Sequence, residues 1–247
     1  GVPVITIIGG YEATWIPAVD YGVPPLSLRG RVLRWVLKFS DRVVVVSEAS
    51  ERGLSSHYPE VTPKTKRISN AVDTNYFQSG AENNRHGVWG GGVINPTTLR
   101  VKGWRLFWEA ASSFPEVPFV AVGPAVDGAG RDLVSHRPPN LLWLGALYGE
   151  ELVRQYQKAS VYFQGSMHES FSLALAESMA CGCIPVVSRN GALPEVAGDV
   201  GCYLAELSVE SAVKAITEAL KAPQERRTAG RQRIVERFDY ARRREAL

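Results

Sequence analysis

The sequence predicts an α/β protein whose strands form parallel sheets. From residue 88 onward, short apolar runs alternate with longer amphipathic stretches, which is the pattern of repeated β-α units. Runs such as "FVAVG" and "IPVVS" show no polar alternation, as expected of strands that helices cover on both faces. Residues 1–70 repeat the pattern with fewer units. With 247 residues, 45% of them apolar, the chain is long enough for more than one folding unit.

The first part of the chain supplies few elements for a complete domain. We expect a buried strand in "VPVITIIGG", a helix in "SLRGRVLRWVLKFS", a strand in "DRVVVVSE", a helix in "ASERGLSSHY" and a short strand in "TKRISN". Three strands are few for a sheet that needs helices on both faces. We therefore interpret this part as the end of a domain whose beginning is absent. The polar, turn-rich segment 78–87 that follows is typical of a linker.

The second part of the chain alternates strands and helices throughout. Strands are predicted at 87–94, 117–123, 140–145, 160–165, 183–188 and 201–204. Helices are predicted near 103–113, 126–136, 149–158, 171–181, 192–198 and 208–221. A last helix, 224–237, follows Pro223, a residue that suits the first turn of a helix.

Composition excludes several classes of protein. No apolar run approaches the ~18 residues of a membrane span, and the first residues lack the basic start of a signal peptide. The three cysteines, Cys181, Cys183 and Cys202, are odd in number and too closely paired for the usual metal half-site. We interpret them as small buried residues of a cytoplasmic protein. No nucleic-acid motif accompanies the net charge of +3.

Basic residues are concentrated at the end of the chain. Residues 221–247 hold nine Lys or Arg against four acids, a net charge of +5, which leaves −2 for the rest. We interpret this run mainly as a solvated helix face. The alternative is a patch for a membrane surface, which would make the protein membrane-peripheral, or for an anionic substrate.

Two glutamates, Glu169 and Glu177, flank a stretch of small and apolar residues in "HESFSLALAESMACGCIPVV" (168–187). If Glu169 lies in the loop before a helix and Glu177 within it, both face one crevice at the carboxyl end of the preceding strand, where open α/β sheets bind ligands. The alternative is a pair of solvated acids, but the neighbours of Glu177 carry too little charge for a solvated face. The start of this helix, "SFSL", would offer free backbone amides to a phosphate.

Several ordered segments together resemble the retaining glycosyltransferases of family 4, which have the two-domain GT-B fold. The stretch 168–187 with the following "GALPEV" resembles the family's E-x7-E region. The segments "DRVVVVSEASERGL", "RISNAVDTNYF" (67–77) and "LRVKGWRLFWEAASSFPEVPFVAVG" (99–123) are similar to other family motifs in the right order. The resemblance implies a donor-binding Rossmann-like domain at 80–225, a partial acceptor-side Rossmann-like domain at 1–79, and a C-terminal helix at 226–247 that returns toward the first domain.

The resemblance also implies roles for residues near the donor. Lys102 matches the family's diphosphate lysine, because a cation there stabilises the charge that develops on the leaving diphosphate. The family's partner arginine has no counterpart in "GGVINPTTLRVKG", and Arg100 is our substitute, with a loop-surface charge as the alternative. Glu169 would contact the donor sugar and Glu177 the ribose. The backbone amides that would meet the diphosphate and sugar belong to Ser170, Phe171, Ser172 and Leu173.

Three further features have two interpretations each, and a fourth has one. His168 would touch the donor, or is a packed or surface histidine. "GGYE" (9–12) would line the acceptor crevice, or is a strand-ending turn. Glu195 would brace the loop 191–199, or simply starts a helix. The aromatics Trp104, Phe107 and Trp108 recur at helical spacing and are predicted to be core residues.

The implied activity is hexosyl transfer, with retention, from a nucleotide diphosphate-sugar to a sugar, lipid-linked or small-molecule acceptor. No metal and no cofactor is expected, since cations at the phosphate do the work of a divalent ion. One alternative is another GT-B enzyme, such as a nucleotide-sugar epimerase or a sugar-phosphate synthase. The other is a non-catalytic nucleotide-sugar binding module. The basic C-terminus suggests a membrane-lipid acceptor as a further hypothesis.

Overall fold

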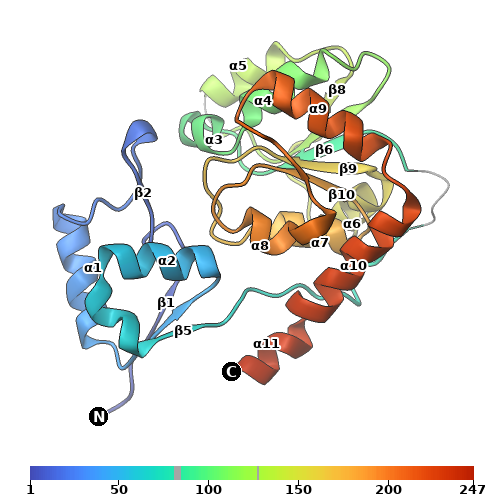
Figure 1. Ribbon diagram of the computed structural model, residues 1–247. Helices are drawn as coiled ribbons and strands as arrows, with labels where there is room; N and C mark the ends of the chain where they lie inside the picture. Colours follow the sequence, from blue (N-terminus) through green and yellow to red (C-terminus); the bar gives the residue numbers. More distant parts are fainter. Residues whose placement is uncertain (81–84, 127) are drawn as a thin grey trace.

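The computed structural model describes residues 1–80, 85–126 and 128–247, and it contains two parallel sheets (Figure 1). The larger sheet has the strand order β11-β10-β9-β6-β7-β8. Its strands are β6 (Val88–Gly91), β7 (Phe119–Val122), β8 (Leu141–Trp143), β9 (Val161–Gln164), β10 (Ile184–Val187) and β11 (Cys202–Tyr203). The smaller sheet has the order β1-β4-β5 and consists of β1 (Ile5–Ile8), β4 (Arg42–Val45) and β5 (Thr65–Arg67). The predicted α/β class with parallel sheets is confirmed.

Helices cover both faces of the larger sheet (Figure 1). On one face lie α3 (Pro96–Val101), α4 (Trp104–Ala111), α5 (Gly128–Ser135) and α9 (Val209–Leu220). On the other lie α6 (Gly149–Lys158), α7 (Leu173–Ala180), α8 (Leu193–Ala197) and α10 (Gln224–Phe238). All predicted helices of this part are present, although α7 begins two residues later than expected and residue 127, in the segment predicted as α5, lies outside the described residues.

Aromatic residues of α4 fill the core between this helix and the sheet. Trp104, Phe107 and Trp108 are buried, as predicted, and the Phe107 ring lies 5.3 Å from Phe119 and 5.6 Å from Phe163 between ring centroids. Burial of each large apolar side chain stabilises the fold by roughly 1.5–3 kcal/mol. These rings therefore hold α4, and the loop before it, firmly against the sheet.

The strand β1 is less buried than the sequence predicts. Ile5 and Ile7 are each 61% exposed, and only Ile8 is buried. The physical reason is that β1 is an edge strand, which pairs with β4 alone, and one of its faces has no covering layer among the described residues. The helices of this part, α1 (Leu28–Phe39) and α2 (Glu48–His57), are present as predicted.

Some elements were not predicted. A two-stranded antiparallel hairpin, β2 (Trp15–Ile16) and β3 (Tyr21–Gly22), extends from the smaller sheet toward the larger domain (Figure 1). Helix α3 begins at an Asn95 capping box with Pro96 in its first turn. The C-terminal helix expected over 226–247 is broken at Asp239, which caps a separate helix, α11 (Tyr240–Ala246).

Four arginines of α10 contradict the interpretation of the basic run as a solvated face, whereas Arg242 and Arg244 of α11 are exposed and agree with it. The four are half-buried and donate hydrogen bonds to backbone carbonyls of the larger domain and of the segment that leads into it. The donors and their carbonyls are Arg226 with Val200 and Gly201, Arg227 with Ser160 and Gly182, Arg231 with Ala180, Phe77 and Thr74, and Arg233 with Val196 and Glu195. A guanidinium has five N–H donors and therefore satisfies several loose carbonyls at once. These four arginines are thus structural.

The crossing between the two sheets is held by contacts from both sides. The Val72 amide donates a hydrogen bond to the Phe238 carbonyl at the end of α10 (2.8 Å). Thr74 Oγ1 donates a hydrogen bond to the carboxylate of Asp239 (2.6 Å). From α11, Arg243 donates to the Ser69 carbonyl at 2.8 Å. Of the predicted linker, residues 78–80 and 85–87 are described, and Arg85 donates to the Ala159 carbonyl at 2.9 Å. Among the described residues, no helix is both long and apolar enough to cross a membrane.

Candidate active site

The loop 165–172 joins β9 to α7 at the carboxyl end of the larger sheet, and two glycine-containing turns hold it. Gly103 has φ +74°, and a Cβ there would lie 2.4 Å from the carbonyl oxygen of Gly165. On the other side, a Cβ on Gly191 would lie 2.3 Å from the Glu169 carbonyl oxygen. Only glycine allows such a close approach of two backbones. The segments that contain Gly103 and Gly191 therefore pack closely against the two sides of this loop.

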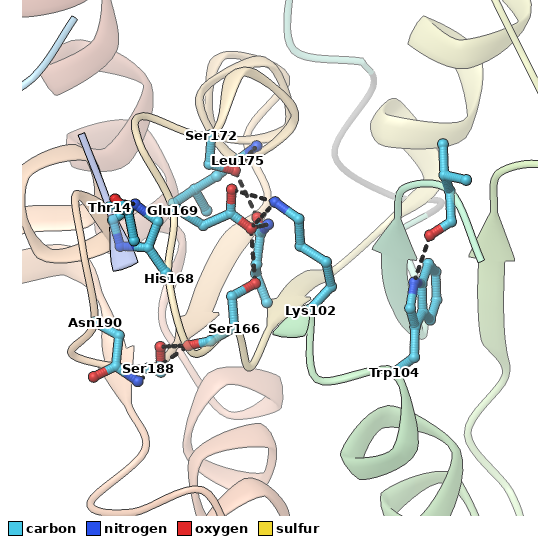
Figure 2. A network of polar contacts seen from close by, with 12 residues as sticks. Thr14, Lys102, Trp104, Ser166, His168, Glu169, Ser172, Leu175, Ser188 and Asn190 are labelled. Atoms are coloured by element: carbon cyan, nitrogen blue, oxygen red, sulfur yellow. Dashed lines mark hydrogen bonds and ion pairs between the residues drawn. The ribbon is translucent and has the colours of Figure 1, made fainter. Parts of the chain in front are cut away.

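Glu169 lies at the centre of this loop and is only 6% exposed. The Lys102 ammonium donates to both of its carboxylate oxygens at 2.7 Å (Figure 2). Gln164 Nε2 and Ser166 Oγ donate to Oε1 at 2.5 and 2.8 Å. A buried carboxylate needs such partners, since its desolvation is otherwise costly. The sequence-predicted Glu169 and Lys102 are thus brought together by the fold.

Several polar side chains that support Glu169 were not identified from the sequence. Ser172 Oγ donates to Gln164 Oε1 at 2.6 Å, which turns the amide nitrogen of Gln164 toward Glu169. Ser188 and Asn190 donate to the Ser166 carbonyl at 2.5 and 3.1 Å (Figure 2). A signal was present, because Gln164 and Ser188 are polar residues at the ends of the otherwise apolar strand segments of β9 and β10, where ligands of open sheets bind.

The start of α7 offers unpaired backbone donors next to Glu169. Ser172, its N-cap, has φ +76°. This left-handed conformation is unusual for a residue other than glycine and costs on the order of 1–3 kcal/mol. Within the described part of the chain, the backbone amides of residues 170–174 make no hydrogen bond. Together with the positive end of the helix dipole, they form an environment that favours an anion.

Glu177 lies further along α7 and lines a cavity of about 370 Å³. The cavity is mostly apolar, with the glycine run 90–92, the aromatic rings of Trp89 and Tyr148, and Leu173 among its walls. Burial raises the pKa of Glu177, and a hydrogen bond from the Tyr156 side chain partly opposes this rise. The volume and the apolar lining fit a small planar ligand, with Glu177 as a polar anchor.

His168 connects this site to the smaller domain. Its Nε2 lies 2.8 Å from Thr14 Oγ1 (Figure 2). Burial lowers the pKa of His168; Glu169 opposes this change and Lys102 adds to it. The imidazole is therefore neutral near pH 7 and suited to donating or accepting one hydrogen bond.

The remaining predicted residues have different surroundings. Ser170 packs against Gly10 of the smaller domain, and Phe171 is buried against Phe238, with 5.2 Å between ring centroids. Arg100 is exposed on α3 and lines another cavity, of about 520 Å³, which is not the cavity of Glu177. Glu195 accepts a hydrogen bond from the Glu48 amide at 2.8 Å, so it braces the two domains at the start of α2. In the described part of the chain, no three His, Cys, Asp or Glu side chains cluster as a metal site would require.

Comparisons with known proteins identify the family of the chain. The family described as "Glycosyl transferases group 1" matches residues 97–234, more than half of the chain. One subunit of phosphatidylinositol N-acetylglucosaminyltransferase from Arabidopsis thaliana is 26% identical over 220 residues, which cover 85% of this chain and 49% of that protein. GDP-mannose-dependent alpha-mannosyltransferase from Mycobacterium tuberculosis is 28% identical over 204 residues, 78% of this chain and 50% of that protein. The chain thus spans about half the length of these curated relatives.

Solved structures show the same fold. Sucrose-phosphate synthase from Thermosynechococcus elongatus superposes with a TM-score of 0.81 at 20% identity, over 98% of this chain and 65% of that one. The Anabaena protein HepE, solved with UDP and glucose, superposes with a TM-score of 0.80 at 17% identity, over 98% of this chain and 69% of that one. The predicted GT-B-like fold is therefore confirmed.

Proposed function

Because the chain belongs to the group 1 glycosyl transferases, we propose that it moves a sugar from a nucleotide diphosphate-sugar to an acceptor with retention of configuration. The observation that carries this proposal is the arrangement around α7. The Lys102–Glu169 pair and the free amides of residues 170–174 lie at its start, and the cavity with Glu177 lies beside it. An E-x7-E donor site as in family 4 would place a diphosphate at the start of the helix and a nucleoside in the cavity.

In the proposed donor position, the nucleoside and the diphosphate occupy the two ends of this site. The base and ribose enter the 370 Å³ cavity, and the ribose hydroxyls donate to Glu177. Burial raises the pKa of Glu177, and hydrogen bonds donated by two ribose hydroxyls would favour its charged form. The diphosphate then meets the amides of residues 170–174 and the positive end of α7.

We propose that donor binding gives Lys102 and Glu169 new partners, a phosphate for Lys102 and sugar hydroxyls for Glu169. Lys102 lies 2.7 Å from Glu169 and is 29% exposed, so its ammonium can turn toward a phosphate. Glu169 keeps Gln164 and Ser166 and is then free to accept hydrogen bonds from hydroxyls of the donor sugar. As the bond from the sugar to the diphosphate breaks, charge grows on the phosphate oxygens, and Lys102 and the amides stabilise it most strongly in the transition state.

We propose a same-face attack, in which the leaving phosphate takes the proton of the acceptor hydroxyl. No protein nucleophile is then required, and the phosphate charge is neutralised by Lys102 and the backbone amides rather than by a metal ion. Glu169 and Glu177 do not act as a glycosidase pair, since Glu177 lines the neighbouring cavity and the two carboxylates do not flank one bond.

A calorimetric titration with UDP, GDP and ADP tests the donor site. We expect one nucleotide to bind at micromolar concentration. The substitution Glu177→Ala should weaken binding at least about tenfold, because it removes the ribose anchor. The matched control is Glu210→Ala, in the exposed first turn of α9, which should bind as the wild type does. Absence of binding by a folded sample, or equal binding by Glu177→Ala, would contradict the donor site.

Product analysis by proton NMR tests the stereochemistry. The one-bond C1–H1 coupling constant of the product, which distinguishes α from β also in manno-configured sugars, should be that of an α-linked sugar when the donor is α-linked. Transfer should also persist in excess chelator, because the phosphate cations belong to the protein. A β-linked product would show inversion and overturn the proposed mechanism.

A further inference from the structure

A pocket lies where the segment after β5 passes the end of α10 and the start of α11 (Figure 1). A parallel bridge between Val72 and Asp239 holds these two parts of the chain side by side. The pocket has a volume of about 160 Å³, far more than the ~10–15 Å³ that a single water molecule needs. It shares no lining residue with the cavity of Glu177, so it is a separate site.

Positive charge dominates the lining of this pocket. Four of the residues around it are arginines: Arg67, Arg237, Arg242 and Arg243. The one acid of the described lining is Asp239. Its carboxylate already accepts hydrogen bonds from Thr74 Oγ1 and from the Ala241 amide, at 2.6 and 2.8 Å. Four guanidinium groups and one carboxylate leave a net charge of +3 around the pocket.

Carboxylates outside the pocket balance this charge only in part. Arg67 lies 3.5 Å from Glu51 and 3.7 Å from Glu48, distances too long for good hydrogen bonds. Arg242 pairs with Glu245 at 3.1 Å, and both side chains are more than half exposed. Exposed pairs of this kind are weak, so these guanidinium groups can take another anionic partner.

Two arginines of the pocket have no carboxylate partner in the described part of the chain. Arg237 makes neither a hydrogen bond nor an ion pair there. Burial lowers the pKa of the nearby Arg233, and the charge of Arg237 lowers it further, as an unbalanced positive charge does. Arg243 donates through Nη1 to the Ser69 carbonyl at 2.8 Å and to Asn70 Oδ1 at 3.1 Å, which leaves its other nitrogens for a further acceptor.

The charge and the donors of this pocket fit a phosphate group. A phosphate monoester carries about −1.5 to −2 charges at pH 7 and three strong acceptor oxygens. Guanidinium groups meet such oxygens with pairs of parallel N–H donors. A carboxylate has one charge and two oxygens, so it would satisfy fewer of the arginines. Asn70 directs its oxygen to Arg243, which leaves its amide nitrogen to donate a further hydrogen bond.

We propose that this pocket binds a phosphate monoester, on a soluble small molecule or on a lipid head group, through Arg237, Arg242 and Arg243. The bound phosphate would join the segment after β5 to α10 and α11, and so brace the crossing between the two sheets. The site is independent of the proposed donor site. It gives a function to the arginines at the end of the chain that hold no backbone carbonyl of the larger domain.

Calorimetric titration of the full chain with inorganic phosphate, glycerol 3-phosphate and glycerol tests this site. We expect both phosphates to bind and glycerol not to bind. The double substitution Arg237→Gln with Arg242→Gln should raise the dissociation constants of both phosphates about tenfold or more, because two charge-assisted partners are lost. Both side chains are exposed, so the variant should fold as the wild type does.

Two further variants serve as controls. Arg244→Gln removes an exposed arginine of α11 that does not line the pocket, and it should bind phosphate as the wild type does. Lys102→Ala should weaken nucleotide binding at the donor site but leave phosphate binding in this pocket unchanged. Thermal unfolding gives a second readout, since a ligand of the folded state raises the Tm. Glycerol 3-phosphate should raise the Tm of the wild type but not that of the double variant.

Sedimentation with vesicles of phosphatidylcholine, with and without about 20% phosphatidic acid, identifies the source of the phosphate. Vesicle binding that glycerol 3-phosphate displaces would assign a lipid head group, whereas binding of glycerol 3-phosphate alone would assign a soluble molecule. Absence of phosphate binding by the folded wild type would overturn the proposal, and so would equal binding by the double variant. Phosphate binding that is lost only in Lys102→Ala would also overturn it, because the anion would then lie at the donor site.

Discussion

The two glutamates of the 168–187 stretch share a helix region but differ in their surroundings. Glu169 is held by Lys102, Gln164 and Ser166 through hydrogen bonds of 2.5–2.8 Å. Glu177 has the Tyr156 hydroxyl as its partner and otherwise faces a mostly apolar cavity, so burial raises its pKa. One carboxylate is therefore fully satisfied before a ligand arrives, and the other is not. In the proposed function, this difference corresponds to a Glu169 that is held in position beside the donor sugar and a Glu177 that gains hydroxyl partners from the ribose.

Among the variants of this region, removal of Lys102 should have the largest effect on transfer rate and stability. The substitution Lys102→Ala should lower the transfer rate by about 10²–10³, the usual loss when one donor to a developing anion is removed. It also leaves Glu169 buried without its cation. The fold should lose on the order of 2 kcal/mol, less than the 3–5 typical of a fully buried pair, because Lys102 is 29% exposed.

The measurement for Lys102→Ala combines initial rates with denaturant unfolding, and Lys158→Ala at the end of α6 is the control. The double variant Lys102→Met with Glu169→Gln should recover stability but no activity, because the uncompensated charge is gone. Recovery of activity in the double variant would show that the pair is structural alone.

Changing the glycine contact that holds the Glu169 loop should have the next largest effect. In Gly103→Ala, the added Cβ meets the Gly165 backbone at 2.4 Å and the residue must keep φ +74°. We expect the unfolding free energy to fall by about 1–3 kcal/mol. The transfer rate should also fall, because the strained residue displaces Lys102. Gly128→Ala, where a Cβ has no neighbour within 4 Å, is the control and should unfold as the wild type does. Equal unfolding of both variants would show that the loop is not held by this contact.

Loosening the far end of α7 should have a smaller effect, confined to stability. Arg231 donates to the Ala180 carbonyl at the end of α7 and to the Thr74 carbonyl at 3.1 Å. The substitution Arg231→Ala should cost about 1–3 kcal/mol, because these carbonyls lose their donors. Thermal unfolding measures the loss, and Arg244→Ala in the exposed part of α11 is the control. A matching loss in Arg244→Ala would indicate a general charge effect.

The substitution Glu177→Gln should have the smallest effect. It should slightly stabilise the fold but weaken nucleotide binding. Since the folded-state pKa of Glu177 is raised, its contribution to stability is present below the unfolded pKa and is lost as pH rises through the folded value. Glutamine keeps a partner for Tyr156 and carries no charge. The variant should therefore be slightly more stable than the wild type at pH 7, with the difference vanishing near pH 4, while nucleotide binding weakens. Thermal unfolding across this pH range measures it, and a wild type that is more stable at pH 7 would contradict the assignment.

The sequence was sufficient for most of the larger domain, because apolar runs and flanking turns identify strands covered on both faces. It was insufficient where burial depends on neighbours far along the chain. Ile5 and Ile7 look like core residues, but β1 is an edge strand. The arginines of α10 look solvated, but their carbonyl partners come from residues 74–201. Helix α3 could have been predicted from its Asn95–Pro96 capping signal.

The site could be predicted only in part for the same reason. Glu169, Glu177 and Lys102 come from motifs, and the fold brings Lys102 and Glu169 together. Gln164 and Ser166 support Glu169 through geometry that no local pattern encodes. Thr14, the partner of His168, lies far from it along the chain, so its placement depends on the docking of two domains. The role of Arg100 stays a prediction, with its side chain on the exposed surface of α3.

A crystal structure of the chain with the nucleotide that calorimetry identifies would test the central claim most directly. We predict the base in the 370 Å³ cavity, the ribose on Glu177, and the diphosphate on Lys102 and the amides of residues 170–174, with the Lys102–Glu169 contact broken or shared. A nucleotide bound elsewhere, for example in the cavity lined by Arg100, with Lys102 still paired only to Glu169, would contradict it.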